Sequence, residues 1–177
     1  MAEDKLTEEI VFLIERVKIV ETIKRLTFHM DRKDWKSYEA EFTEQVEVDF
    51  TDTPFGGKAA RIATRAQWAA AVASGLARFF ETQHFAVNYF VEINGDRARA
   101  ITYFIARHFM KVPDGGKYLL DQGGYYTHKL VKINGVWKVD FNKLTPLWDA
   151  GDPEALKPAQ AGGLSRSGRN CSESSQP

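Results

Sequence analysis

The sequence has 177 residues, of which 44% are hydrophobic, with 24 basic and 24 acidic side chains. A chain of this length forms one domain with a substantial core, and its balanced charge provides no basic surface for nucleic acid or an anionic membrane. It contains no apolar run of membrane-helix length, no signal-peptide pattern at its start, and one cysteine, Cys171, with no partner for a disulfide within the chain. We therefore expect a cytoplasmic protein that binds neither nucleic acid nor membranes.

The first part of the chain predicts three helices and one strand. Apolar residues recur every three or four positions over 10–30, which is the pattern of a long amphipathic helix. A shorter helix is predicted over 34–42, and a capping box predicts that a third helix begins at Thr64. Between these two helices, the alternation over 46–50 predicts a strand, and the glycines and proline of 53–58 predict a loop.

The pattern changes from helical to alternating near residue 84. Strong turn residues, such as Asn134-Gly135, separate the successive alternating segments. These segments predict four strands, over 84–93, 97–112, 118–133 and 136–142. Helices followed by an antiparallel meander indicate an α+β fold with the helices packed on one face of the sheet.

Alternation also predicts which residues of the strand over 97–112 face the helices. Because Arg97 and Arg99 should face water, every second residue from Ala98 to His108 should face inward. A bulge in so long a strand would reverse this register beyond it.

The end of the sequence differs in composition from the rest. Glycine, serine, proline and alanine dominate from residue 151 onward, and periodicity stops there. We expect one domain over 1–150 and a disordered tail over 151–177, whose first residues could cover a pocket.

The residue types that carry chemistry favour acid–base catalysis or plain binding. The four histidines, His29, His84, His108 and His128, include no pair at the spacing of metal ligands. The sequence also lacks a glycine-rich phosphate loop and a nucleophile elbow. We therefore expect no metal, no cofactor and no covalent intermediate.

Several short motifs follow one another in a recognisable order. They are Asp31 with Asp34-Trp35 after the long helix, Val-x-Val-Asp, a histidine at a strand start, Asn-Gly-Asp, Gly-Gly-x-Tyr and Asn-Gly-Val-Trp-Lys-Val. This ordered set resembles the SnoaL-like branch of the NTF2-like superfamily, and within it the scytalone dehydratases, over residues 6–148. The resemblance implies an NTF2-like cone, an α+β barrel with N-terminal helices packed on a curved, mostly antiparallel sheet.

The resemblance also implies a catalytic pair. In that family an aspartate at the end of the first helix orients a histidine that acts as the general base, and Asp31 and His84 occupy these positions here. A carboxylate bonded to one ring nitrogen fixes the tautomer and leaves the other nitrogen to remove a proton beside a carbonyl. General acid–base catalysis of this kind raises the rate of a reaction by ~10² to 10⁴-fold. The alternative is that Asp31 only ends a helix and that His84 is a core histidine.

Further residues are candidates for acid–base or substrate-binding roles. His108 is predicted to face the cavity, although the second pocket histidine of the dehydratases aligns nearer Met110. Tyr126 stands where the family places a polar substrate contact. The remaining candidates are Tyr38, Asn88 and Asp49, the last near the position of the proton-shuttling aspartate of ketosteroid isomerases. The alternatives are a buried histidine bonded to the backbone, a core tyrosine ring and an outward strand residue.

The chain departs from the scytalone dehydratases at the group that polarises the carbonyl. Two tyrosines hold a water against the substrate carbonyl in those enzymes, whereas Met30 and Phe50, which stand here, donate no hydrogen bond. Tyr38, Tyr126 or His108 are the candidate replacements. The rest of the pocket is predicted to be apolar, with a lining of Phe28, Phe50, Trp68, Phe104 and Leu147.

These residues predict a cofactor-independent dehydratase or isomerase that acts on a hydrophobic, oxygenated cyclic substrate of the polyketide, aromatic or steroid type. One alternative is a non-catalytic NTF2-like subunit or ligand-binding module, such as the small subunit of a ring-hydroxylating dioxygenase. Another is a polyketide cyclase, in which one carboxylate does the work. The resemblance also implies a homo-oligomer, either a dimer or a trimer.

Overall fold

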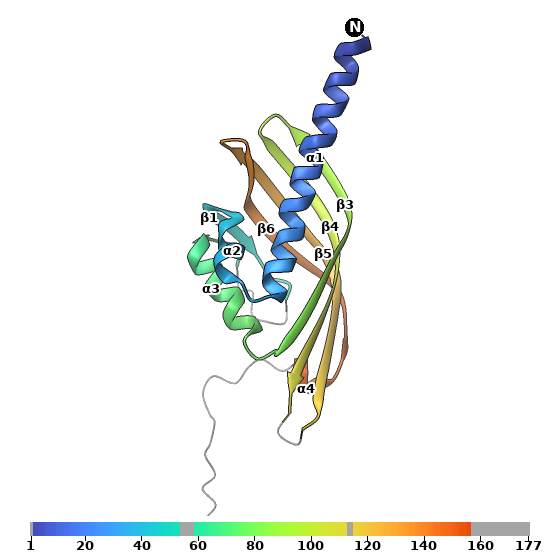
Figure 1. Cartoon of the computed structure of the whole chain (residues 1–177). Coiled ribbons are helices and arrows are strands. Elements are labelled where there is room, and N and C mark those ends of the chain that lie inside the picture. The colour runs from blue at the N-terminus through green and yellow to red at the C-terminus, as the bar shows by residue number, and fades with distance from the viewer. Residues whose placement is uncertain (1, 54–58, 113–114, 157–177) are drawn as a thin grey trace, which may run out of the picture.

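The computed structural model describes residues 2–53, 59–112 and 115–156. Two helices precede the first strand and a third follows the second strand, and all three occupy one face of a curved sheet (Figure 1). The elements are α1 (Ala2–Asp31), α2 (Trp35–Ala40), β1 (Phe42–Asp49), β2 (Arg61–Thr64), α3 (Arg65–Leu76), β3 (Glu81–Asn94), β4 (Arg97–Lys111), β5 (Lys117–Ile133), β6 (Val136–Gly151) and α4 (Pro153–Leu156).

The sheet has six strands in the order β2-β1-β6-β5-β4-β3 and does not close into a barrel. Strands β3 to β6 form the predicted antiparallel meander, while β1 runs parallel to β6. The α+β class and the NTF2-like architecture are thus confirmed, with an open mixed sheet in place of a closed barrel. The strands at the two edges of the sheet are β2 and β3.

The predicted register of β4 is confirmed along its whole length. Ala98, Ala100, Thr102, Phe104, Ala106 and His108 are all buried, while Arg97, Arg99 and Arg107 are exposed. The bulge lies in β3 instead, between Val87 and Phe90. Asn88 occupies it with φ of +54°, a left-handed conformation that asparagine tolerates better than most residues.

Two strand features were not predicted. The short β2 lies in a stretch with no clear alternation, and β6 extends nine residues beyond its predicted end at 142. The register of β5 with β6 shifts beside Pro146, between Gly123 and Gly124. Because proline donates no backbone hydrogen bond, it is tolerated in a strand at such an irregularity.

The core lies where α1 crosses the sheet. Ile19, Ile23 and Leu26 of α1 pack with Trp137 and Val139 of β6, all at most 4% exposed. Glu15 of α1 contacts both β6 and β5. It accepts a hydrogen bond from Trp137 Nε1 of β6 at 2.7 Å and pairs with Lys132 of β5 at 2.9 Å. Hydrogen bonds from Lys18 and Lys132 lower the pKa of Glu15 to about 2.

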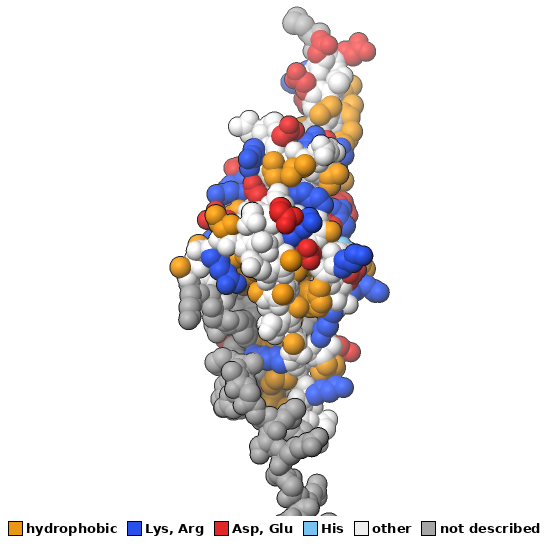
Figure 2. Space-filling view, turned by 90° about the vertical axis from the view of Figure 1, so that its left-hand side faces the viewer, with side chains coloured by type: hydrophobic (Ala, Val, Ile, Leu, Met, Phe, Trp, Pro, Cys, Tyr) orange, Lys and Arg blue, Asp and Glu red, His pale blue; other side chains and the backbone are white. Residues whose placement is uncertain are grey.

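The first turns of α1 project beyond the sheet (Figure 1). Hydrophobic side chains gather there among charged ones (Figure 2). Leu6, Ile10, Leu13 and Val17 are between 47% and 57% exposed, so the described chain leaves this stripe of the helix largely uncovered. No helix among the described residues combines the length and hydrophobicity of a membrane span.

The described structure continues six residues past the predicted domain boundary at 150. Gly151 ends β6, and α4 follows over 153–156. Ala155 is fully buried against Phe79 and Leu120. The rest of the predicted tail, 157–177, lies outside the described residues, as does most of the predicted loop over 53–58.

Candidate active site

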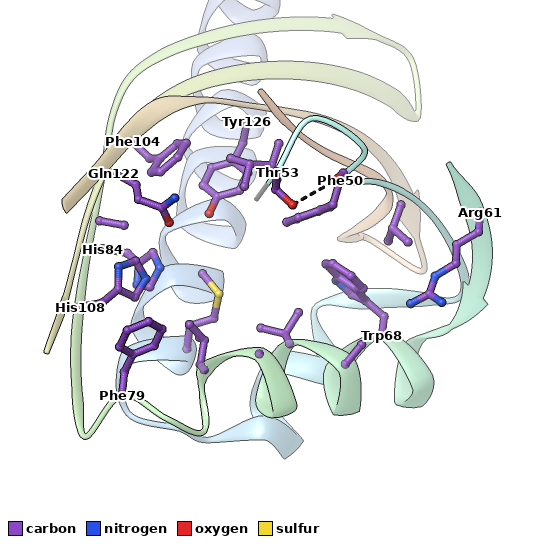
Figure 3. A pocket seen from close by; sticks show the side chains of 18 of the residues that line it. Phe50, Thr53, Arg61, Trp68, Phe79, His84, Phe104, His108, Gln122 and Tyr126 are labelled. Atoms are coloured by element: carbon purple, nitrogen blue, oxygen red, sulfur yellow. Dashed lines mark hydrogen bonds between the residues drawn. The ribbon is translucent and has the colours of Figure 1, made fainter. Parts of the chain in front are cut away.

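A cavity of about 470 Å³ lies between α3 and the inner face of the sheet (Figure 3). This volume is in the range of small-molecule sites. Its wall is mostly apolar, and its polar side chains come from β3, β4, β5, β2 and the segment before β2. The wall consists of Met30, Val48, Phe50, Thr53, Ala59, Arg61, Trp68, Ala71, Val72, Gly75, Leu76, Phe79, His84, Phe104, Ala106, His108, Gln122, Tyr126 and Leu144.

A tight turn at the end of α1 places Asp31 beside the edge strand β3. The N–H of Asp34 donates to the carbonyl of His29 and that of Lys33 to the carbonyl of Met30, which is the Schellman pattern of helix termination. Lys33 takes the left-handed position, with φ of +54°. Its Nζ donates to the carbonyl of Phe79, which fixes the helix end to the segment that leads into β3.

The structure brings Asp31 and His84 together. Asp31 Oδ1 lies 2.7 Å from His84 Nδ1 and accepts from Thr82 Oγ1 at 2.9 Å, and Oδ2 accepts from the backbone N–H of His84 at 2.8 Å. That N–H is free to do so because β3 is an edge strand. Because the carboxylate accepts only, Nδ1 carries the hydrogen, and the lone pair is on Nε2. The His84 side chain, 5% exposed, lies in the cavity wall.

His108 lies next to this pair. Its ring stands perpendicular to that of His84, with the two centroids 5.3 Å apart. Nδ1 lies 3.3 Å from the carbonyl oxygen of Leu120, and the residue is 4% exposed. Burial, and then the nearby His84, lower the pKa of His108 to about 4, so its ring is neutral at pH 7. His108 thus faces the cavity, as the register of β4 predicted, and it also bonds to the backbone, while its role in acid–base chemistry stays a prediction.

Two hydrogen-bond donors from β5 point into the cavity, Tyr126 and Gln122 (Figure 3). Burial raises the pKa of Tyr126, so its hydroxyl keeps its proton and can donate. Gln122 was missing from the predicted site. The signal for it was present in the sequence, since it stands four residues before Tyr126 and therefore on the same face of an alternating strand.

Three of the residues predicted to line the pocket, Phe50, Trp68 and Phe104, do lie in the cavity wall. Phe50 and Trp68 pack with ring centroids 4.8 Å apart, and Phe104 packs on Tyr126 at 4.7 Å. They make the surface against which an apolar ligand would pack.

Phe28 and Leu147 do not line the cavity, which corrects the prediction. Phe28 is 58% exposed because it lies two residues from Met30, on the opposite side of α1. Leu147 is 60% exposed and lies at the irregularity beside Pro146. The inward position on β6 is held by Leu144, three residues earlier and so on the other face of the strand.

Tyr38, Asp49 and Asn88 also lie outside the cavity wall. Tyr38 is a core residue, 2% exposed, packed on Phe42. Val48 and Phe50, on either side of Asp49, face the cavity, and Asp49 points away from it. The Asp49 carboxylate pairs with Lys143 Nζ at 2.7 Å, which lowers the pKa of Asp49. Asn88 is exposed on the bulge of β3.

The described residues contain no group of three or more histidine, cysteine, aspartate or glutamate side chains arranged to hold a metal ion. His128 is buried beside Tyr126 but is not in the cavity wall. His29 lies on the far side of the end of α1, 3.9 Å from both Asp34 and Glu41. The polar groups available for chemistry are therefore those of the cavity wall and Asp31.

Comparison with protein-family models gives a match to the SnoaL-like domain over residues 12–142. Among functionally curated proteins, no significant sequence match is found.

Many solved structures share the fold. The Kfla4162 protein of Kribbella flavida superposes with a TM-score of 0.70 at 22% identity, over 80% of this chain and 95% of that one. A protein of Novosphingobium aromaticivorans provisionally named scytalone dehydratase gives 0.64 at 20%, over 78% and 87%. A hexachlorocyclohexane dehydrochlorinase of type 3 from Novosphingobium barchaimii gives 0.66 at 14%, over 82% and 94%. At these identities the likeness concerns the fold.

Proposed function

Since this chain belongs to the SnoaL-like family, we propose that it is a cofactor-independent lyase or isomerase that removes a proton beside a carbonyl of a hydrophobic cyclic substrate. The observation that carries the proposal is the 2.7 Å contact between Asp31 Oδ1 and His84 Nδ1. It leaves the basic nitrogen of a nearly buried imidazole in the wall of an apolar cavity.

Each step of the chemistry has a group in this cavity. His84 Nε2 takes the proton from carbon, and the negative charge of Asp31 stabilises the imidazolium that forms. The negative charge that develops on the carbonyl oxygen is met by a donor, for which Tyr126 and Gln122 of the cavity wall are the candidates, since Met30 and Phe50 cannot donate.

The same first step serves both reaction classes. In a dehydration, the enolate forms a C=C bond as the C–O bond breaks, and the proton on His84 passes to the departing hydroxyl, which leaves as water. In an isomerisation, that proton returns to a different carbon. Two of the similar structures are named for eliminations, a dehydratase and a dehydrochlorinase, and this supports the lyase class.

A direct test uses 1-tetralone, a bicyclic ketone with acidic protons beside its carbonyl. The protein is expected to accelerate the exchange of these protons for deuterium in D2O, measured by mass spectrometry. If 1-tetralone quenches the tryptophan fluorescence of the protein and yet exchanges at the uncatalysed rate, the chain is instead a ligand-binding module, the first alternative drawn from its sequence.

Self-association is part of this proposal, and the projecting half of α1 supports it. Leu6, Ile10, Leu13 and Val17 are spaced by four, three and four residues, which is the heptad spacing of a helix–helix seam. A helix that projects into water is marginal by itself. The same seam on a second copy is a matching partner, and in an antiparallel pair Glu9 beside the seam would meet Arg16 of the other copy.

The Leu13→Lys substitution is therefore expected to convert a dimer or larger oligomer into monomers, because it buries a charge in the seam. Size-exclusion chromatography with light scattering measures the mass. Val136→Lys is the matched control, because Val136 is 48% exposed at the first position of β6, next to the turn from β5. An unchanged mass for Leu13→Lys would place the interface elsewhere.

A further inference from the structure

The described part of the cavity wall contains a single permanently charged side chain, Arg61. It is the first residue of β2, and Figure 3 shows its guanidinium turned toward the cavity beside Trp68. The other polar groups of the described wall are two hydroxyls, an amide, two imidazoles and the indole N–H of Trp68. Among the described residues no carboxylate belongs to the wall, and Asp31 lies behind His84 and outside it.

Arg61 differs from most arginines on the sheet. Arg97, Arg99 and Arg107 each pair with a carboxylate on the outer face, at distances from 2.6 to 3.5 Å. Arg65, four residues from Arg61, reaches Glu39 and Glu44. Among the described residues, in contrast, no carboxylate forms an ion pair with Arg61. Arg61 is exposed to solvent, and its charge is available to a group that enters the cavity.

The two histidines and Arg61 lie at opposite ends of the cavity, with Tyr126 and Thr53 between them (Figure 3). The aromatic side chains of Phe50 and Trp68 lie on the Arg61 side (Figure 3). A ligand that spans the cavity therefore meets imidazoles at one end, an apolar wall along its length and a guanidinium at its other end.

We infer that the substrate carries a carboxylate, which Arg61 binds while the apolar ring system fills the cavity and the carbonyl end meets His84. A guanidinium binds a carboxylate through two parallel hydrogen bonds. A phosphate monoester fits less well, because it carries nearly two negative charges at neutral pH and the described wall offers one positive charge. This inference rests on the proposed function and names the substrate class for it: a hydrophobic cyclic keto acid.

The test compares two ligands that differ in one charge, 2-naphthoate and 2-naphthamide. The native protein is expected to bind the naphthoate about tenfold more tightly, as one charge-assisted contact in a partly exposed site allows. Arg61→Gln should reduce the affinity for naphthoate to that for naphthamide and leave the naphthamide affinity unchanged. Arg61→Lys should keep part of the preference. Isothermal titration calorimetry measures both ligands.

Arg99→Gln is the matched control, since it removes the same charge from the outer face of the sheet, where Arg99 pairs with Glu92. It should leave the preference unchanged. Equal affinities in the native protein, a preference that survives Arg61→Gln, or no measurable binding of naphthoate would each overturn the inference.

The binding test is independent of turnover. His84→Asn should leave the preference for naphthoate in place, because the two side chains lie at opposite ends of the cavity (Figure 3). A naphthoate preference that depends on Arg61, found together with no exchange of tetralone protons, would thus reject the catalytic proposal and keep the anion site. Exchange of tetralone protons without a naphthoate preference would keep the catalytic proposal and reject the anion site.

Discussion

Replacing His84 by asparagine is expected to slow the exchange of the α-protons of 1-tetralone by ~10² to 10⁴-fold. Asparagine has no nitrogen that accepts a proton near neutral pH, so the base is lost. Its amide can still donate to Asp31, which limits the damage to the helix end and to β3. Exchange is measured by mass spectrometry in D2O, with circular dichroism and urea unfolding as the checks on the fold.

Asp31→Asn tests the second member of the pair. An asparagine amide can donate to the ring nitrogen that now donates to Asp31, which favours the wrong tautomer of His84, and an exchange rate lower by ~10² or more is expected. His29→Asn is the control, because His29 lies near Asp34 and Glu41 and not in the cavity wall. A folded His84→Asn protein with the full rate would remove His84 from the mechanism and favour the cyclase alternative.

Acid is expected to destabilise the fold strongly between about pH 6.5 and pH 4. Burial lowers the pKa of both His108 and His128 to about 4 from an ordinary 6.5. In this range the unfolded chain binds protons that the folded chain does not, so the free energy of unfolding falls as the pH falls. Below about pH 4 both states are protonated and these two groups add no further loss. Between pH 7 and pH 5, each histidine should account for about 2 kcal/mol.

A substitution separates this effect from that of the carboxylates. His128 is buried beside Tyr126 and lies outside the cavity wall, so His128→Asn changes the titration without replacing a group of the proposed chemistry. Urea unfolding of both proteins at pH 7 and pH 5 gives the comparison. The loss of stability on acidification should be smaller by about 2 kcal/mol in the variant. An identical loss in both proteins would show that folding does not lower the pKa of His128.

Features that depend on neighbours along the chain were predicted well. The capping box of Thr64 and Gln67 is present, with both of its hydrogen bonds, because its partners are three residues apart. The inward register of β4 holds to its end, since side chains alternate wherever the strand is regular. The prediction was wrong where regularity failed, as at the bulge of Asn88 and beside Pro146.

The candidate site depends both on residues that the sequence identifies and on contacts that only the folded structure makes. The family resemblance singled out Asp31 and His84 and implied their contact, which no local pattern could have shown, because the two are 53 positions apart. Their contact depends on the left-handed turn at Lys33 and on a free backbone N–H at the edge of the sheet. Arg61 was not found, because β2 is short and has no pattern of its own.

The amino-acid sequence by itself determined the α+β class, the helix caps, the turns and the alternating faces of the long strands. These follow from interactions within a few residues, which the local order of residue types specifies. Only the tertiary structure decided that Arg61, His84 and Gln122 share one cavity and that Phe28 and Leu147 do not. The curvature of the sheet and the path of α1 across it result from packing between distant segments, and no short stretch of sequence contains that information.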